Sequence, residues 1–457
     1  MNNEEKQKQL LEDAKKTLEG NWTGNFTIPA ATLYPHQWSW DSAFIAIGNS
    51  YFNTDRAIKE LEFLFNAQWH NGMLPHIVFN EKEKTYFPAA DFYDIARSPN
   101  APDHIGTSGM TQPPVHAIAC YYIYENSKDK IEAKNFLSSI YPRLKQFHNY
   151  LMTDRDPEKS GLVTIFHPWE SGLDDSPLWD EALSKIRIRD LLKFERLDVV
   201  AVGGAKETIP SDEMYNKFIY MIELMKQYNY DEQKMYANFP FKIKSMVFSS
   251  ILYAANKYMI KIANILGEGG QDIQQIKEWI SRTEKNFYKY FLPAGQKLGA
   301  TEEALFCNYD LVSKDWIRKR TISSLVPIYT GLIPREEIDI FVKWITHAHW
   351  CGIEGKCHSS ALPSTDLDEL YFKPLTYWRG PVWVNTNWMI WLGLLKYGYR
   401  QAAERIKHGI LELAANHGLR EYYDPFTGEG LGGKSFSWTA ALVIDMIKDK
   451  GIGIPPD

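Results

Sequence analysis

Hydrophobic residues recur along most of this chain with the period of an amphipathic helix. Between residues 54 and 69 the apolar side chains fall on one stripe of a helix, and the charged side chains fall outside it. The residues of this stripe are Ala57, Ile58, Leu61, Leu64, Phe65 and Trp69. Residues 402–417 repeat the pattern, and Gly418 stands where a glycine commonly ends a helix. The pattern predicts a chain built mainly of helices.

The same period predicts helices in many other segments. They are residues 4–19, 113–126, 134–154, 212–228, 241–266, 270–290, 316–330, 335–349, 383–398 and 436–449. A further apolar helix is expected to begin near Asp41. Strand-like alternation is sparse and short. Long irregular stretches at 71–112, 157–180, 350–382 and 418–435 separate the helices, and loops of this length inside a compact domain are usually functional.

The order of these elements indicates the architecture. Helices alternate with loops rich in glycine, proline and aromatic residues, which suggests concentric rings of helices with the functional loops gathered at one end of a barrel. We find no linker rich in proline or serine, so we expect residues 1–457 to form a single catalytic domain. The segment 181–240 differs by its mixed charge and by the paired Gly203 and Gly204, and we interpret it as a helical lid inserted over the site.

The amino-acid composition limits the classes of function that the protein can have. With 44% hydrophobic and 24% charged residues in 457, the chain has the profile of an ordinary globular protein with a large core. Its net charge of −6 provides no basic surface for nucleic acid and favours a neutral or modestly charged substrate. The 15 Trp and 26 Tyr are numerous; aromatic faces pack against the C–H faces of sugars, although most such rings simply fill a core.

Cysteines and terminal segments bear on location. Four cysteines, Cys120, Cys307, Cys351 and Cys357, are too few for a disulfide framework at this size. The polar N-terminus shows no apolar signal segment, and no stretch reaches the roughly 18 apolar residues of a membrane span. We therefore expect a reducing, cytoplasmic setting and no membrane partner. The sequence is compatible with a homo-oligomer.

Two acidic segments far apart in the chain carry the candidate chemistry. One is HPWESGLDDSP from His167 to Pro177, and the other is LREYYDPFTGEGLGGKSFSW from Leu419 to Trp438. Asp174 and Glu421 are separated by 421 − 174 = 247 positions, so only tertiary folding can bring them together. Two carboxylates across a sugar-sized cleft are what hydrolysis of a glycosidic bond requires. The leading hypothesis is a glycosidase.

The first segment contains three candidates for the general acid. Glu170, Asp174 and Asp175 all compete for the role, because an acid catalyst needs only a raised pKa and partial burial. Gly172 beside them would let the backbone approach a ligand closely. Residues 376–388 add three tryptophans and Arg379, an available ion-pair partner within the site.

Other polar residues lie in aromatic surroundings suited to sugar. Trp38 and Trp40 beside Asp41 resemble a sugar-binding wall, although Asp41 could equally be no more than a helix cap. Gln112 and Tyr86 could bind hydroxyl groups or could be turn residues near a helix start. The set His347, His349, Cys351, Cys357 and His358 suggests zinc, but its spacing lies outside the usual zinc pattern, so no metal is expected. We also find no P-loop, dinucleotide fingerprint or other cofactor motif, and no cofactor is expected.

Taken in order, these motifs resemble a known family. YPHQWSWDS, GMTQPP, HPWESGLDDSP, LPSTDLDE with YWRGPVW, and EYYDPFTGEGLG with FSWTAA span nearly the whole chain. Together they resemble glycoside hydrolase family 63, in particular its compact bacterial mannosylglycerate and glucosylglycerate hydrolases, with a more distant similarity to trehalases and processing α-glucosidases. The resemblance implies an all-α (α/α)6 barrel and an inverting mechanism with Asp174 as general acid and Glu421 as general base. The substrate-binding residues that it implies are Tyr34, Trp38, Ser39, Trp40, Asp41, Tyr86, Gln112, Gly172, Tyr215, Tyr377 and Trp378.

One position departs from the family pattern. Glycerate-cleaving members carry an Arg that holds the substrate carboxylate, and Ile209 occupies that place here, in KETIPSDEMY. A carboxylate without a guanidinium partner loses a charge-assisted pair. Lys206 could compensate as a point charge, and Tyr215 matches a lid tyrosine of those enzymes.

The sequence leaves several functions to compare. We expect an inverting α-glycosidase acting on a small α-glucoside or α-mannoside, such as a 2-O-glycosylglycerate or a disaccharide of the trehalose or kojibiose kind. A sugar 2-epimerase would use a similar barrel with a histidine pair, and a sugar-binding protein would need no catalytic carboxylates. The two acidic motifs favour the hydrolase.

Overall fold

The computed structural model describes residues 3–83, 86–188, 210–299, 304–352 and 355–456. Its α-helices are α1 (Asn3–Gly20), α2 (Ser39–Ser50), α3 (Thr54–Asn66), α4 (Ala90–Tyr93), α5 (His116–Asn126), α6 (Lys130–Thr153), α7 (Asp180–Ser184), α9 (Asp212–Gln227), α10 (Glu232–Asn238), α11 (Met246–Leu266), α12 (Gln271–Phe291), α13 (Arg335–Ile345), α14 (Val384–Tyr397), α15 (Arg400–His417) and α16 (Ser437–Lys448). Its strands are β1 (Gln37–Trp38), β2 (Ile77–Val78), β3 (Thr164–Ile165), β4 (Ile243–Lys244), β5 (Asn308–Asp310), β6 (Asp315–Ile317), β7 (Val382–Trp383), β8 (Arg420–Tyr423) and β9 (Gly430–Lys434). None of the helices in these ranges is long and apolar enough to cross a membrane.

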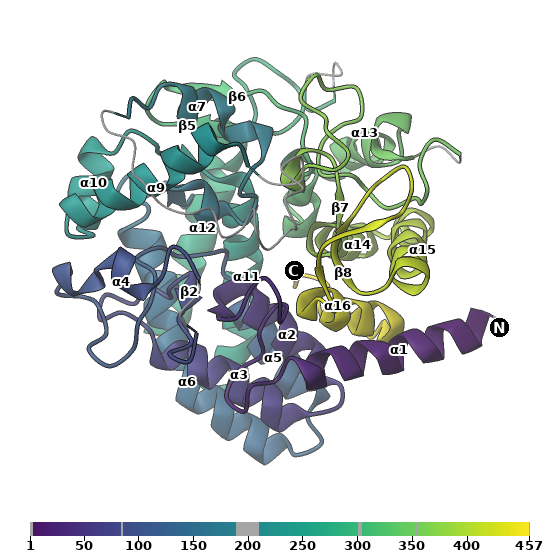
Figure 1. Cartoon of the computed structure of the whole chain (residues 1–457), viewed down its shortest axis with the longest axis horizontal. Helices are drawn as coiled ribbons and strands as arrows, with labels where there is room; N and C mark the ends of the chain where they lie inside the picture. The colour runs from purple at the N-terminus through teal and green to yellow at the C-terminus, as the bar shows by residue number, and fades with distance from the viewer. Residues whose placement is uncertain (1–2, 84–85, 189–209, 300–303, 353–354, 457) are drawn as a thin grey trace.

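Alternate helical elements form a closed inner ring. Helix α2 packs against α5, α5 against α11, α11 against a 3-10 helix at Val326–Thr330, this against α14, α14 against α16, and α16 back against α2. The elements between them in the chain lie outside, so that α3, α6, α12, α13 and α15 form the outer layer together with α1. Figure 1 shows α2, α11 and α16 around the middle of the molecule, with α6, α13 and α15 farther out. The architecture is an (α/α)6 barrel.

The hydrophobic pattern explains which helix goes where. Every residue of α2 is buried, as expected of a helix that is enclosed on all sides. Outer helices bury only one stripe, and α12 buries Ile276, Trp279, Thr283 and Phe287 at the three- and four-residue spacing of a single helix face. The two rings therefore follow from two kinds of hydrophobic pattern.

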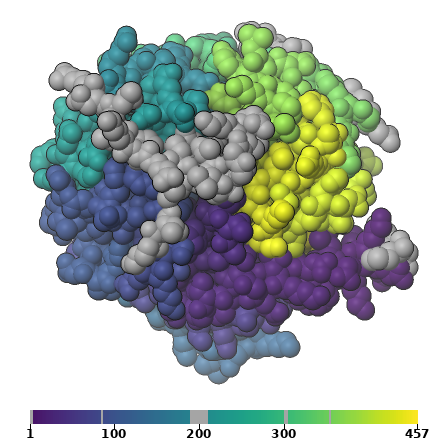
Figure 2. Space-filling model, viewed as in Figure 1, coloured from purple at the N-terminus to yellow at the C-terminus, as the bar shows by residue number. Residues whose placement is uncertain are grey.

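Helix α1, at the N-terminal end of the chain, completes the outer layer. Helix α1 packs on α16, and also contacts α15. Figure 2 shows the N-terminal segment in purple lying against the C-terminal segment in yellow. Helix α1 therefore covers the outside of α16, the helix that closes the inner ring.

Short antiparallel strands gather where inner helices begin. Strands β1 and β2 form one pair, β3 to β6 form a four-stranded sheet, and β7, β8 and β9 form a three-stranded sheet. Strands β1, β4 and β7 end within two residues of the start of α2, α11 and α14, respectively. The strands thus orient the loops that enter the barrel at one end.

The predicted helices were largely confirmed, with one clear error at residues 316–330. There, Asp315–Ile317 pairs as β6 with β5, and the following residues form two short 3-10 helices. Pro327 lacks the N–H that an α-helix needs in its interior, and Gly331, at φ +73°, ends the second turn. Strand pairing and proline override the helical periodicity of this segment.

Candidate active site

A cavity of about 500 Å³ opens at the end of the barrel where the strands gather. Trp, Tyr and Phe side chains are prominent in its wall, alongside carboxyl groups and the polar side chains of Gln112 and His76. The residues that line it include Tyr34, Trp38, Trp40, Asp41, His76, Glu83, Tyr86, Gln112, Trp169, Gly172, Asp174, Pro210, Tyr215, Tyr377, Trp378, Glu421, Tyr422, Gly432, Phe436 and Trp438. Volume and lining are those of a pocket for one small ligand.

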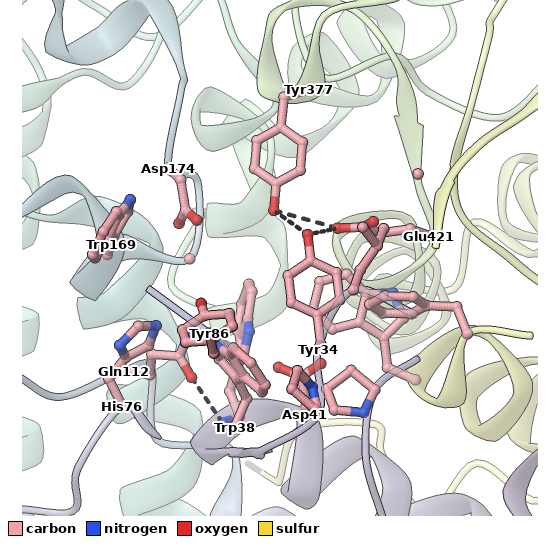
Figure 3. A pocket seen from close by; sticks show the side chains of 18 of the residues that line it. Tyr34, Trp38, Asp41, His76, Tyr86, Gln112, Trp169, Asp174, Tyr377 and Glu421 are labelled. Carbon is pink, nitrogen blue, oxygen red and sulfur yellow. Dashed lines mark hydrogen bonds between the residues drawn. The ribbon is translucent and has the colours of Figure 1, made fainter. Parts of the chain in front are cut away.

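Glu421 enters this cavity from strand β8 and is held by three donors. Its Oε1 accepts hydrogen bonds from the hydroxyls of Tyr34 at 2.9 Å and Tyr377 at 3.3 Å, and its Oε2 accepts one from the Gly433 N–H at 2.8 Å. Figure 3 shows the two tyrosine hydroxyls converging on the carboxylate. Burial raises the pKa of Glu421 to about 7, while the three hydrogen bonds act to lower it. The carboxylate is rigidly oriented and ionises near neutrality.

The backbone and side chains around the Glu421 carboxylate are tightly packed. Gly432 has φ +63°, and a Cβ at this position would come within 2.3 Å of Glu421 Oε2. Tyr377 adopts φ +32°, a conformation that non-glycine residues rarely take. Its carbonyl accepts a hydrogen bond from Trp383 Nε1 at 3.0 Å, and the Trp383 ring stacks on Trp378 at 4.0 Å between centroids. This packing holds the strained backbone of Tyr377, so that its hydroxyl reaches the carboxylate.

Asp174 faces the same cavity from the opposite wall. It follows a 3-10 helix at Pro168–Ser171 and Gly172, whose φ is +74° and where a Cβ would come within 2.4 Å of the Trp40 ring. Figure 3 shows the Asp174 carboxyl across the pocket from Glu421. Burial, and then the negative charges of Glu421 and Asp175, raise its pKa well above the ordinary value. Asp174 therefore retains its proton where an ordinary aspartate is ionised.

The structure separates Asp174 from its two competitors. Glu170 is fully buried behind the wall, where Arg155 donates to both of its oxygens at 2.8 and 2.7 Å. Asp175 forms an ion pair with Arg379, with 3.3 Å between its Oδ1 and the guanidinium nitrogen Nη2. The same nitrogen lies 2.5 Å from Asp180 Oδ1. Of the three acidic side chains, only Asp174 lines the cavity. Arg379 is thus an ion-pair partner of the acidic loop, as expected.

The residues expected to bind sugar are mostly brought together. Gln112 Oε1 accepts a hydrogen bond from the Trp40 N–H at 3.2 Å, which leaves its amide nitrogen for a ligand. Burial and the charge of Glu421 raise the pKa of Asp41 well above the ordinary value. Ser39 differs, because its buried hydroxyl pairs with His116 Nε2 at 3.1 Å and it is not among the lining residues. The remaining lining residues of the prediction are Tyr34, Trp38, Trp40, Tyr86, Gly172, Tyr215, Tyr377 and Trp378.

Some lining residues were not anticipated. His76, Trp169 and Trp438 lie in the wall, and the motifs NGMLPH, HPWES and FSWTAA contained each of them without marking a role. His76 Nδ1 is buried without a hydrogen-bond partner, and burial lowers its pKa to about 3. Glu83 also lines the cavity, next to a loop whose sequence carries no periodic signal. Of the segment 181–240, which the sequence analysis interprets as a lid, Pro210 and Tyr215 line the cavity, whereas Lys206 and Ile209 lie outside the described residues.

Two of the four cysteines, which the sequence predicted to be reduced, are paired. Cys351 and Cys357 form a disulfide, which closes a loop of the segment that precedes the Tyr377 wall. Both sulfurs are used, so the zinc set considered from the sequence does not form. The expectation of reduced cysteines was wrong for this pair, because spacing alone says nothing about the distance between two residues of an irregular loop. Cys120 and Cys307 are free and buried.

The fold and the two opposed carboxyl groups define the class of protein. An (α/α)6 barrel with an aromatic pocket, a carboxylic acid on one wall and a carboxylate on the other is a glycoside hydrolase. Residues 34–439 match the family model of the mannosylglycerate hydrolase MGH1-like glycoside hydrolase domain, and the chain belongs to this family.

Similar proteins agree over almost the full length. The chain is 38% identical to a mannosylglycerate hydrolase of Rubrobacter radiotolerans over 96% of both chains. It is 33% identical to a glucosylglycerate hydrolase of Mycolicibacterium hassiacum over 96% of this chain and 98% of that one. The crystal structure of a family 63 mannosylglycerate hydrolase from Thermus thermophilus, in complex with Tris and D-glycerate, matches with a TM-score of 0.86 at 38% identity, covering 95% of this chain and 99% of that chain. Neutral trehalase from Saccharomyces cerevisiae shares the fold, with a TM-score of 0.57 at 15% identity over 93% of this chain and 73% of that one.

Proposed function

We propose that this protein hydrolyses a small α-linked glycosylglycerate, with mannose or glucose as the sugar, and inverts the anomeric configuration. The carrying observation is the pair of opposed carboxyl groups in the pocket, one holding a proton through its raised pKa and one oriented by three hydrogen bonds. The names of similar proteins support glycerate as the aglycone.

In this proposal each carboxyl group has one task. Asp174 protonates the leaving glycosidic oxygen, and its raised pKa keeps it supplied with the proton. Glu421 removes a proton from water as that water attacks the anomeric carbon from the opposite face. Tyr34, Tyr377 and the Gly433 N–H keep the Glu421 carboxylate in one orientation, so that the water is activated at a defined position. An inverting enzyme of this kind places its carboxyl groups about 6.5–9.5 Å apart.

A second substrate class is favoured by the charges of the wall. Among the described lining residues there are four carboxyl groups, Asp41, Glu83, Asp174 and Glu421, and no Lys or Arg. A glycerate carboxylate in such surroundings has no cationic partner on this wall. A neutral α-glycoside, such as a glycosylglycerol or a disaccharide, fits these charges better.

Product analysis distinguishes these substrates. The purified enzyme is incubated with mannosylglycerate, glucosylglycerate, glycosylglycerol, trehalose and kojibiose, and the free sugar is measured. Proton NMR of fresh hydrolysate should show the β-anomer first from an α-glycoside, and initial release of the α-anomer contradicts inversion. Epimerisation of a free sugar without hydrolysis, or binding without turnover, contradicts the proposed function.

The cellular setting is part of the proposal. We place the enzyme in the cytoplasm, and a homo-oligomeric state is compatible with its sequence. Cell fractionation and light scattering test these two points.

A further inference from the structure

The acidic motif HPWESGLDDSP opens with a histidine whose two ring nitrogens are both used. His167 is fully buried and is not among the residues that line the cavity. Its Nδ1 accepts a hydrogen bond from the Trp169 N–H at 3.0 Å, and its Nε2 lies 3.1 Å from the carbonyl oxygen of Phe218 in α9. One side chain thus connects the turn before Asp174 with a residue that stands 51 positions farther along the chain.

The two contacts fix where the ring carries its proton. An Nδ1 that accepts from a backbone N–H is unprotonated, and a neutral imidazole then carries its hydrogen on Nε2. This nitrogen donates to the Phe218 carbonyl. Burial lowers the pKa of His167 to about 3, so the ring stays neutral near pH 7 and keeps this one arrangement of donor and acceptor.

The Nδ1 contact shapes the turn that leads to Asp174. His167 stands at the N-cap of the 3-10 helix Pro168–Ser171, and its side chain binds a backbone N–H at the start of that helix. The Glu170 N–H donates to the His167 carbonyl at 3.0 Å. Gly172 ends the helix, and Asp174 follows two residues later. A cap of this kind satisfies a backbone donor that the short helix cannot pair by itself.

The Nε2 contact places α9 against the same turn. Tyr215, three residues before Phe218, lines the cavity, as does Trp169. The Trp169 ring packs edge-on against both, with centroids 6.1 Å from Tyr215 and 5.6 Å from Phe218. The His167 ring joins this group at 4.8 Å from Trp169 and 5.4 Å from Phe218. A hydrogen bond needs a defined distance and angle, so the His167 contact fixes the register of α9 against the turn.

A second connection lies deeper behind the wall. Arg155 binds Glu170 of the turn, and its Nε lies 3.0 Å from Oε2 of Glu232 in α10. This buried group holds the turn and the α9–α10 segment together without His167. Variants of His167 are therefore expected to fold, and their effect should be local to the rings that face the cavity.

We propose that His167 is a positioning residue of the active site, which holds the turn that leads to Asp174 and helix α9 with Tyr215 in one fixed arrangement. Its Nδ1 serves the position of Asp174, and its Nε2 serves the position of Tyr215. The kinetic expectations rest on the proposed hydrolase function, with Asp174 as the acid and Tyr215 as a substrate contact. The bridge between the two segments does not depend on that function.

Two substitutions separate the two contacts. His167→Asn keeps an acceptor where Nδ1 stands, since asparagine is among the preferred N-cap residues, but its side chain is too short to reach Phe218. His167→Gln carries an amide nitrogen where Nε2 stands and has no acceptor in the place of Nδ1. Each variant therefore removes one contact and retains the other.

The kinetic effects of the two variants should differ in kind. His167→Asn should raise KM about tenfold and change kcat by less than about threefold, because the helix of Tyr215 loses a buried hydrogen bond. His167→Gln should lower kcat at least about tenfold with a smaller change in KM, because a slightly displaced acid loses much of its catalytic effect. A residue that only stabilised the fold would not divide kcat from KM in this way.

His148→Asn is the matched control. His148 is a fully buried histidine of α6, its Nδ1 lies 2.7 Å from Asn256 Oδ1, and it is not among the lining residues. The substitution should lower Tm but preserve kcat and KM. All variants are compared at a temperature at which circular dichroism shows them to be folded.

Hydrogen–deuterium exchange measures the bridge without any substrate. The Trp169 amide should exchange faster than in the wild type in His167→Gln but not in His167→Asn, and the amides in the first half of α9 should do the reverse. Absence of glycoside hydrolysis by the wild type would refute the proposed function, and the exchange pattern would then still decide on the bridge. The same kinetic change in both variants, or wild-type exchange at both places, overturns the proposal.

Discussion

At the scale of single residues, Glu421 and Asp174 face one cavity but differ in what surrounds their carboxyl groups. Burial raises the pKa of both groups. Three hydrogen-bond donors act to lower the pKa of Glu421, whereas the negative charges of Glu421 and Asp175 raise the pKa of Asp174 further. Environments that push two pKa values apart in this way support our proposal that Glu421 is the base and Asp174 the acid.

Neutralising either side chain should remove catalysis and preserve the fold. We expect Asp174→Asn and Glu421→Gln each to lower kcat by about 10²–10⁴-fold or more, because a positioned acid or base typically contributes that much. Steady-state kinetics and thermal unfolding measure the two effects. Glu62→Gln, on the exposed face of α3, is the control and should change neither. Near-wild-type activity in either active-site variant shows that the residue has been assigned the wrong role.

The pH dependence should report the hydrogen bonds to Glu421. The base must be ionised, so activity should fall as pH drops through the pKa of Glu421 at about 7, and it should fall at high pH once Asp174 loses its proton. Tyr34→Phe removes a donor that lowers the pKa of Glu421, and the acidic limb should therefore move to higher pH. A hydrogen bond to a charged group is worth about 1.5 kcal/mol, or about one pH unit.

Tyr377→Phe provides the comparison, because its hydroxyl is farther from Glu421, at 3.3 Å against 2.9 Å, and should shift the limb less. The limb is measured from kcat/KM against pH. A limb that stays in place in both variants means that Glu421 is not the group that titrates there.

At the scale of elements, the β8–β9 hairpin positions the Glu421 carboxylate through its glycines. Gly432→Ala should lower kcat by at least about 10²-fold, since its Cβ would collide with Glu421 Oε2 and displace a positioned base. Gly267, at φ +79° and with nothing within 4 Å of an added Cβ, is the matched control. Both substitutions should cost about 1–2 kcal/mol of stability for the positive φ, but Gly267→Ala should retain full kcat. Equal kinetic losses would mean that the effect is one of stability alone.

The loop that carries Asp174 is anchored by the buried ion pair of Arg155 with Glu170. Arg155→Leu leaves Glu170 buried without its cation, and removing one partner of such a pair costs about 3–5 kcal/mol. Denaturant unfolding measures this loss. Glu213→Gln breaks an exposed pair with Lys217 and should change stability by less than about 1 kcal/mol. A small effect of Arg155→Leu would show that water or a rearranged neighbour satisfies Glu170.

At the scale of the whole molecule, the charges around the pocket bear on the aglycone. Because Ile209 stands where glycerate-cleaving relatives are expected to carry an Arg, glycosylglycerate and neutral glycosylglycerol should differ in kcat/KM by less than about tenfold, or 1.4 kcal/mol. Ile209→Arg should raise the preference for the acidic substrate. A strong native preference that Lys206→Ala abolishes would show instead that Lys206 holds the carboxylate.

Much of the architecture was accessible from the pattern of residues. Helical periodicity is local, so the buried α2 and the one-sided α3 and α15 could be located without knowing their neighbours. The acidic and aromatic motifs likewise contain the residues that line the cavity, because a pocket wall requires particular side chains. The segment 316–330 was assigned wrongly since its structure depends on pairing with β5, which lies outside the segment.

By itself, then, the sequence determined most of the helices, the family and the set of candidate carboxylates. The tertiary structure shows which of the three acidic side chains reaches the cavity: Glu170 pairs with Arg155, Asp175 pairs with Arg379, and Asp174 faces the cavity that Glu421 also lines. The disulfide of Cys351 with Cys357 was also decided there. The physical reason is that propensity and periodicity act through the local backbone, whereas charge pairing, burial and disulfide formation depend on distances in space that the sequence pattern does not give.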